Sequence, residues 1–251
     1  MDKLVDVIAD IPSILETLDT IRDHLTGDEI NSWMAYSTLL SECYDVEASL
    51  RSWEKEFKGR VEAYDYTITG IPPPEPEKDE DFATVHISCM YWAVCILLYS
   101  TIRACERGLT FDHTPGQTTP GSTTSTSSHG GGLELDFFAY RIARAVPLLY
   151  NECAGTYGSI VSLFPVGVAL QYLVVAESMS GIRSEERAIL LDIMNKPFMG
   201  SQVGRFLRNL QRRSVKRDNM EEDVECKVEI AKIWLYGSQA RTIADQQICL
   251  D

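Results

Sequence analysis

The feature that most constrains the fold is an uncharged run, ISCMYWAVCILLYSTI, which extends from Ile87 to Ile102. His86 precedes the run and Arg103 follows it. A helix that spans a bilayer needs about 20 apolar residues, and this run is shorter. An apolar helix without a polar face is typical of a helix that other helices surround. The sequence therefore predicts a helical protein built around one central helix, here called the hub helix.

Other segments have the periodicity of amphipathic helices, because apolar residues recur at every third or fourth position. Pro12 is expected to break or kink the first of them, giving a short first piece and a longer second piece that begins near Ser13. No alternating β pattern of useful length is present, so the prediction is an all-α, single compact domain of about eight helices that spans residues 1–251. The predicted helices cover residues 3–25, 28–58, 81–107, 133–154, 159–178, 185–194, 202–213 and 221–235.

Two segments are predicted to lie outside the helices. Residues 71–81, IPPPEPEKDED, are rich in proline and charge and are expected to form an extended surface linker. Residues 113–132, HTPGQTTPGSTTSTSSHGGG, have low complexity and cannot offset their ordering entropy by burial. We expect this second segment to be a disordered loop inside a continuous domain.

Charge and cysteine content restrict the classes of function. The net charge is −14, and an acidic surface repels phosphate backbones, so direct DNA binding is disfavoured. The 7 cysteines form no CxxC pair, which argues against a zinc or redox motif of that kind. No secretory signal is present at the N-terminus, and we expect an intracellular protein with reduced thiols and no membrane span. No metal or cofactor is predicted.

No nucleotide-binding, zinc-protease or serine-hydrolase motif occurs, so candidate site residues must be chosen one by one. His86 stands at the entrance of the hub helix and could act as a general base beside an aromatic pocket formed by Tyr91 and Trp92. The alternative is a half-buried histidine whose ring bonds a neighbouring backbone group.

A second set of candidates lies on the helices that follow the low-complexity loop. Asp136, Tyr140 and Arg144 are spaced four residues apart and share one helix face. Either Arg144 or the nearby Arg141 could bind a ligand carboxylate. Gln171 lies among aliphatic residues and needs a hydrogen-bond partner if it is buried. A pocket between the hub helix and residues 133–154 and 159–178 would be lined by Tyr91, Trp92, Tyr140, Arg144 and Gln171.

Simpler structural roles compete with these ligand contacts. The charged residues of 133–154 are equally compatible with a surface ion pair of small energy. Glu177 is expected to form a local salt bridge with Arg183. One basic cluster is followed directly by the acidic stretch 221–225, so we expect the carboxylates of that stretch to neutralise its positive charge. The cluster consists of Arg205, Arg208, Arg212, Arg213, Lys216 and Arg217.

Three stretches together resemble the fungal-specific transcription-factor domain, the helical regulatory region of zinc binuclear cluster regulators. The run from Ile87 to Ile102 resembles that family's YWA-plus-aliphatic helix. AGTYGSIVSLFPVGVAL, Ala154 to Leu170, resembles its glycine-tyrosine-glycine turn and the helix that follows, and SEERAILLDIM, Ser184 to Met194, resembles the next helix. The likeness extends from about Ile11 to Arg213, but the six-cysteine zinc cluster of such regulators is missing.

The resemblance implies a regulatory-type domain that binds a small apolar ligand or a protein partner, in transcriptional control or secondary metabolism, in the nucleus or cytoplasm. It brings no catalytic signature. The alternative is an enzyme that guides the cyclisation or isomerisation of an apolar natural product, without a cofactor and with His86 as acid or base. A third hypothesis is a dimerisation module that pairs two copies of the chain.

Overall fold

The computed structural model describes residues 2–24, 29–65, 70–71, 73–110, 135–150, 155–181 and 183–195. The loop predicted at 113–132, the helices predicted at 202–213 and 221–235, and the basic cluster near Arg205 lie outside these described residues. The all-α prediction is confirmed, since the described part contains helices and no strand. Its elements are α1 (Asp2–His24), α2 (Glu29–Glu62), α3 (Asp79–Thr110), α4 (Leu135–Ala145), the 3-10 helix η1 (Val146–Tyr150), α5 (Gly155–Val161), α6 (Leu163–Ser180) and α7 (Glu185–Met194).

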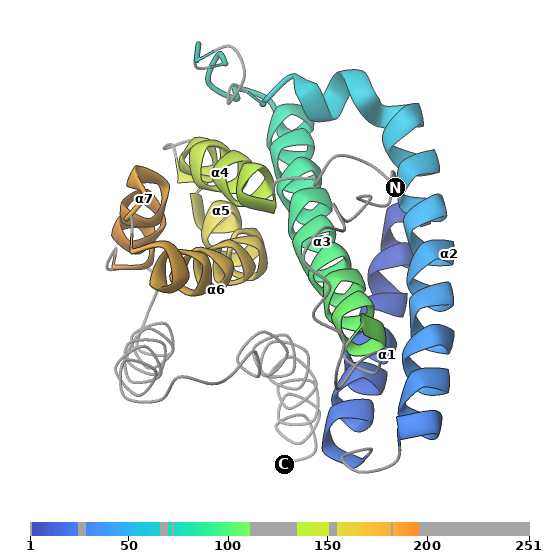
Figure 1. Cartoon of the computed structure of the whole chain (residues 1–251). Helices are drawn as coiled ribbons and strands as arrows, with labels where there is room; N and C mark the ends of the chain where they lie inside the picture. The colour runs from blue at the N-terminus through green and yellow to red at the C-terminus, as the bar shows by residue number, and fades with distance from the viewer. Residues whose placement is uncertain are drawn as a thin grey trace, which may run out of the picture.

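Helix α3, which contains the predicted hub, lies between two groups of helices (Figure 1). Helices α1 and α2 pack on one side of it, and α4, η1 and α6 pack on the other. Side chains from several faces of α3 are therefore buried, as expected for a helix that others surround. Its most deeply buried residues include Val85, Cys89, Trp92, Ala93, Val94, Cys95, Leu98 and Cys105.

The length and apolar character of α3 would also allow it to cross a membrane. Its most apolar window has a mean hydropathy of 1.7, and 67% of that window is buried inside the structure. A central helix in the core of a helical domain meets the same criterion, so this feature by itself does not indicate a membrane span.

Helix α1 is continuous through Pro12, so the prediction of a break at this residue is wrong. A proline inside a helix costs about 3 kcal/mol because it removes one hydrogen bond and clashes with the preceding turn. Around it, Ile11, Ile14 and Leu15 are buried in the core. Each such side chain contributes about 1.5–3 kcal/mol on burial, so packing of the apolar face outweighs the cost of the proline.

The segment predicted as one helix at 133–154 changes geometry at its middle. Helix α4 ends at Ala145, and Pro147 lies in the 3-10 helix η1 that follows, where its missing N–H cannot support an α-helical bond. Gly158 of α5 then packs directly on η1. A Cβ atom at Gly158 would lie 1.7 Å from the carbonyl oxygen of Leu149, so this contact admits glycine alone.

The ends of α6 and α7 follow the local sequence closely. Pro165 lies in the first turn of α6, where a proline is tolerated. Gly181 ends α6 in the left-handed conformation, with φ of 71°, and its N–H donates to the carbonyl of Glu177 at 2.8 Å. Ser184 caps α7 by accepting a hydrogen bond from the N–H of Arg187.

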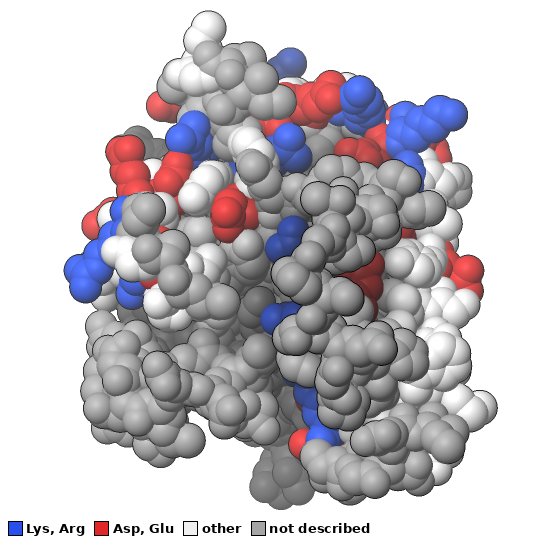
Figure 2. All heavy atoms as spheres, viewed as in Figure 1, with Lys and Arg blue, Asp and Glu red and all other residues white. Residues whose placement is uncertain are grey.

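The proline-rich segment leads into α3, which begins at Asp79, inside the predicted linker 71–81. Ile71 is 73% exposed, whereas Pro76 is buried. Asp79, Glu80 and Asp81 form an acidic first turn, which the helix dipole favours, and the carboxylate of Asp81 accepts a hydrogen bond from the N–H of Lys78 at 3.1 Å. Figure 2 shows acidic and basic side chains intermingled at this end of the molecule.

Trp92 provides a test of how firmly α3 is packed. Its side chain is 0% exposed, so Trp92→Ala should lower the free energy of unfolding by about 3–5 kcal/mol through lost burial and a residual cavity. Phe137, which is 43% exposed on α4, serves as an aromatic control, and Phe137→Ala should cost less than about 1 kcal/mol. Urea denaturation measures both values, and a similar cost for the two variants would contradict this account of the core.

Candidate functional site

Tyr91 and Trp92 are core residues, and Tyr91 faces α2. Tyr91 is 4% exposed, and its ring centroid lies 5.3 Å from that of Trp53, which in turn stacks on Phe57 at 5.0 Å. Burial raises the pKa of the Tyr91 hydroxyl well above its ordinary value. The structure thus places Tyr91 on the side of α3 that faces α2. The predicted pocket would require Tyr91 to face α4 and α6 instead.

His86 pairs with a residue that the sequence analysis did not select. Its Nδ1 atom lies 3.2 Å from the hydroxyl of Tyr157 on α5, and the two rings meet edge to face at 6.0 Å. Burial lowers the pKa of His86, so the neutral imidazole is favoured near pH 7. Tyr157 is 40% exposed, which leaves this histidine–tyrosine pair at the surface.

Arg144 and Asp136 connect α4 to two other helices. The guanidinium of Arg144 donates from Nε and from a terminal nitrogen to Oε1 of Glu186 on α7, at 3.1 and 2.7 Å. The hydroxyl of Tyr172 on α6 donates to Asp136 at 2.8 Å. Neither contact is the intrahelical pair that the spacing of α4 allowed, and the proposed ligand-binding group of Arg144 already has a carboxylate partner.

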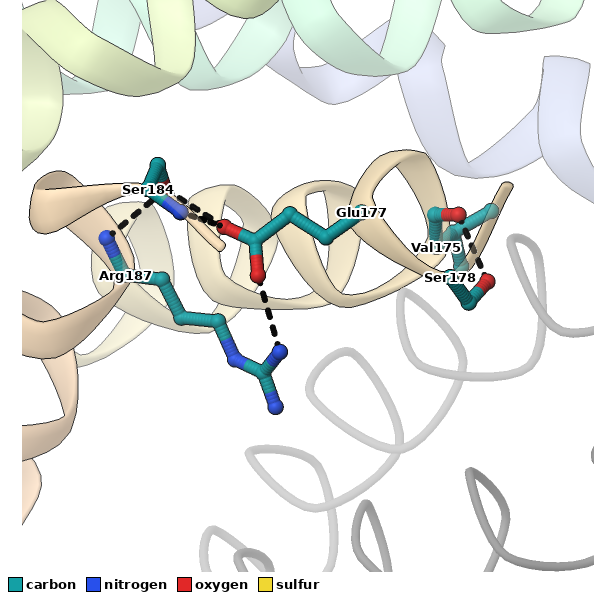
Figure 3. Close-up of polar contacts among 5 residues, drawn as sticks. All are labelled: Val175, Glu177, Ser178, Ser184 and Arg187. Carbon is teal, nitrogen blue, oxygen red and sulfur yellow. Dashed lines mark hydrogen bonds and ion pairs between the residues drawn. The ribbon is translucent and has the colours of Figure 1, made fainter. Parts of the chain in front are cut away.

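A third set of bonds joins α6 to α7, as Figure 3 shows. Glu177 accepts hydrogen bonds from the backbone N–H of Ser184 at 2.8 Å and from its hydroxyl at 2.5 Å, and its other oxygen lies 2.8 Å from Arg187. Arg187 therefore takes the role that the sequence analysis gave to Arg183. Burial acts to raise the pKa of Glu177, but the bonds from Arg187 and Ser184 outweigh it and hold the pKa below its ordinary value.

Tyr140 and Gln171 are the two remaining residues of the predicted pocket. Tyr140 is half-buried on α4, and burial together with the charges of Asp136 and Glu186 raises the pKa of its hydroxyl. Gln171 is 5% exposed on α6. The structure therefore brings Tyr140 close to the polar contacts of Arg144, while Gln171 belongs to the buried part of α6.

The three polar contacts link α4, α6 and α7 pairwise, and we call this set the α4–α6–α7 network. It consists of Asp136–Tyr172, Arg144–Glu186 and Glu177–Ser184–Arg187. Because Asp136, Glu177 and Glu186 each accept a hydrogen bond from another helix or from a cap residue, their charge is used to hold helices together. In the part of the chain that the structure describes, no group of three His, Cys, Asp or Glu is arranged to hold a metal ion.

The partners that sequence analysis missed share one property, which is their distance along the chain. Glu186 is 42 residues from Arg144, Tyr157 is 71 from His86, and Tyr172 is 36 from Asp136. Such pairs have no helical spacing to mark them. Comparison with known proteins supplies no template for them, since no family model, curated protein or solved structure matches the chain.

A double-mutant cycle tests the α6–α7 contact. Glu177→Gln, Arg187→Gln and the double variant should give a coupling energy of about 1–3 kcal/mol, because Glu177 is largely buried and charged. The exposed pair Lys58–Glu62, with nitrogen and oxygen 3.6 Å apart, is the matched control and should give about 0.5 kcal/mol or less. Equal coupling energies in the two cycles would contradict the expectation that the buried Glu177–Arg187 pair is stronger than an exposed pair.

The depressed pKa of His86 has a measurable consequence for stability. In the unfolded chain this residue takes up a proton as the pH falls through its ordinary pKa of 6.5, while the folded state resists protonation. Folding stability should therefore decrease as the pH is lowered below 6.5, and this decrease should be smaller in His86→Gln. Urea denaturation from pH 7 to pH 5 measures the difference, and parallel curves would contradict the expected pKa.

Proposed function

We propose that this chain is a regulatory-type helical domain that binds a protein partner at its surface and has no catalytic activity of its own. This is the role that its resemblance to the fungal-specific transcription-factor domain implies, within transcriptional control or secondary metabolism in the nucleus or cytoplasm. The helical fold is compatible with that role. Because the net charge is −14, the proposal includes no direct contact with DNA.

The observation that favours a partner over an internal ligand is the contrast between two tryptophans. Trp92, the residue chosen to line a pocket, is 0% exposed, whereas Trp33 near the start of α2 is 46% exposed and the adjacent Met34 is 58% exposed. Tryptophan is among the residues most enriched at the energetic centres of protein interfaces. Two neighbouring large apolar side chains on one helix are therefore the best anchors for a partner.

The charged side chains that follow these anchors along α2 indicate what kind of partner fits. From Asn31 to Ser49 the charged side chains are all acidic, namely Glu42, Asp45 and Glu47. Figure 2 shows mostly uncharged side chains over the lower part of α2, where this segment begins. We infer a partner segment that combines apolar side chains with lysine or arginine, for example one face of a basic amphipathic helix.

Photo-crosslinking tests this proposal. Benzoylphenylalanine at position 34 of the full chain should give a covalent adduct with a partner in cells that make the protein, and Trp33→Ala should reduce that adduct at least about tenfold, the effect of losing about 1.4 kcal/mol of binding. Val5, an exposed apolar residue of α1, is the control position and should give little adduct. Equal adduct at positions 5 and 34, or no effect of Trp33→Ala, would contradict the assignment of this surface.

The second candidate function, an enzyme acting on an apolar natural product, rests on the pair His86–Tyr157. A neutral imidazole 3.2 Å from a tyrosine hydroxyl at the surface could accept a proton from a bound substrate. If an apolar compound is converted by the purified chain, His86→Ala should abolish turnover while binding is retained. Unchanged turnover in that variant would remove His86 from the mechanism.

A further inference from the structure

Helices α2 and α3 run antiparallel and in close contact, as seen in Figure 1. Two contacts establish how they are aligned. The rings of Trp53 and Tyr91 lie 5.3 Å apart, and nearer the other end a Cβ atom at Gly108 would lie 2.6 Å from the ring of Tyr36. The backbone of α3 therefore approaches α2 very closely near Gly108, in its last turn.

Cys43 of α2 and Cys105 of α3 face each other between these two contacts. Cys105 lies one turn before Gly108, and Cys43 lies two turns after Tyr36. Their side chains form a hydrogen bond with each other, and both residues are 0% exposed. Two thiols from different helices are thus already in contact in the folded chain.

The surroundings of this pair distinguish its two thiols. The hydrogen bond from Cys43 and the positive charge of Arg22 on α1 lower the pKa of the Cys105 thiol, although burial opposes them. The same hydrogen bond and burial raise the pKa of Cys43. Cys105 is therefore the thiol that ionises first, and the thiolate is the nucleophilic form.

Both thiols are fully buried, so a reagent can reach them only when the fold opens locally. The residues that follow them, Tyr44 and Glu106, are exposed on neighbouring helix faces. Cys105 is also close to the end of α3 at Thr110, and terminal turns of helices open more readily than their centres.

We propose that Cys43 and Cys105 are an oxidant-sensitive pair that a peroxide converts into a disulfide joining α2 to α3. The thiolate of Cys105 attacks one oxygen of the peroxide and becomes a sulfenic acid, and for hydrogen peroxide the other oxygen leaves as water. The thiol of Cys43 then displaces a second water and forms the S–S bond. The two thiols give up two protons and two electrons, and the peroxide takes up both. This proposal is independent of the partner surface on α2.

Two other cysteines of α3 provide internal controls. Cys89 and Cys95 are as deeply buried as Cys105, and burial raises the pKa of each thiol. Both lie on one helix, and neither has a thiol partner within the described residues. If burial or general thiol reactivity governed the reaction, Cys89 and Cys95 would be oxidised as readily as Cys105. If the preformed pair governs it, Cys105 and Cys43 should react in preference.

Peptide mapping of the full chain tests the proposal. After reduction, brief treatment with hydrogen peroxide and blocking of free thiols, trypsin should release one linked species, residues 23–51 joined to residues 104–107. Each of these peptides contains a single cysteine, while Cys89 and Cys95 share the separate peptide 79–103. The linked species should be the main disulfide product, and dithiothreitol should remove it.

Variants separate the pair from its surroundings. In the unmodified chain peroxide should raise the urea midpoint, because a disulfide constrains the unfolded state. Cys105→Ser should abolish both the linked species and this shift, whereas Cys89→Ser should behave like the unmodified chain. The proposal is wrong if the 23–51/104–107 species is absent, or if peroxide links Cys89 or Cys95 to other cysteines in equal yield. Because the main result is read from the unmodified chain, it does not depend on whether Cys105→Ser folds.

Discussion

Burial of α3 on several faces is the constraint on which the rest of the structure depends. A long apolar helix is stable in water when other helices cover it, and here the cover comes from α1 and α2 on one side and from α4, η1 and α6 on the other. Several ion pairs of the described part join helices other than α3, and some of their carboxylates are buried. Arg144, Glu177 and Arg187, for example, join the outer helices to one another.

Much of the fold could be predicted from the sequence because local rules and packing agree there. Ser184, followed by Glu185 and Glu186, marks the beginning of α7, and the predicted bounds 185–194 match the structure. Pro12 is the opposite case, because the local rule predicted a break and the buried stripe of α1 overrode it. Pro147 shows that the same residue type does alter the helix where α4 gives way to η1.

The candidate site could be predicted only in part. Asp136, Tyr140 and Arg144 were correctly placed on one helix, since their spacing follows from helix geometry. What each of them contacts depends on how distant helices pack, and the sequence contains no local pattern for the Arg144–Glu186 or His86–Tyr157 contacts. Tyr91 illustrates the same limit, because the uncharged run predicted that other helices surround this segment but could not tell which of them Tyr91 faces.

The α4–α6–α7 network has a consequence for how this chain can change over time. Each of its three helices is bonded to both of the others, so loss of one contact leaves every helix still attached through a second. If Arg144 is substituted, α7 is still held by the contact of Arg187 with Glu177. If Arg187 is substituted, α7 is still held by the contact of Arg144 with Glu186. Among related chains, one of these two contacts should often be missing, but rarely both in the same chain. This dependence between positions 144 and 187 could be detected in an alignment of sequences alone.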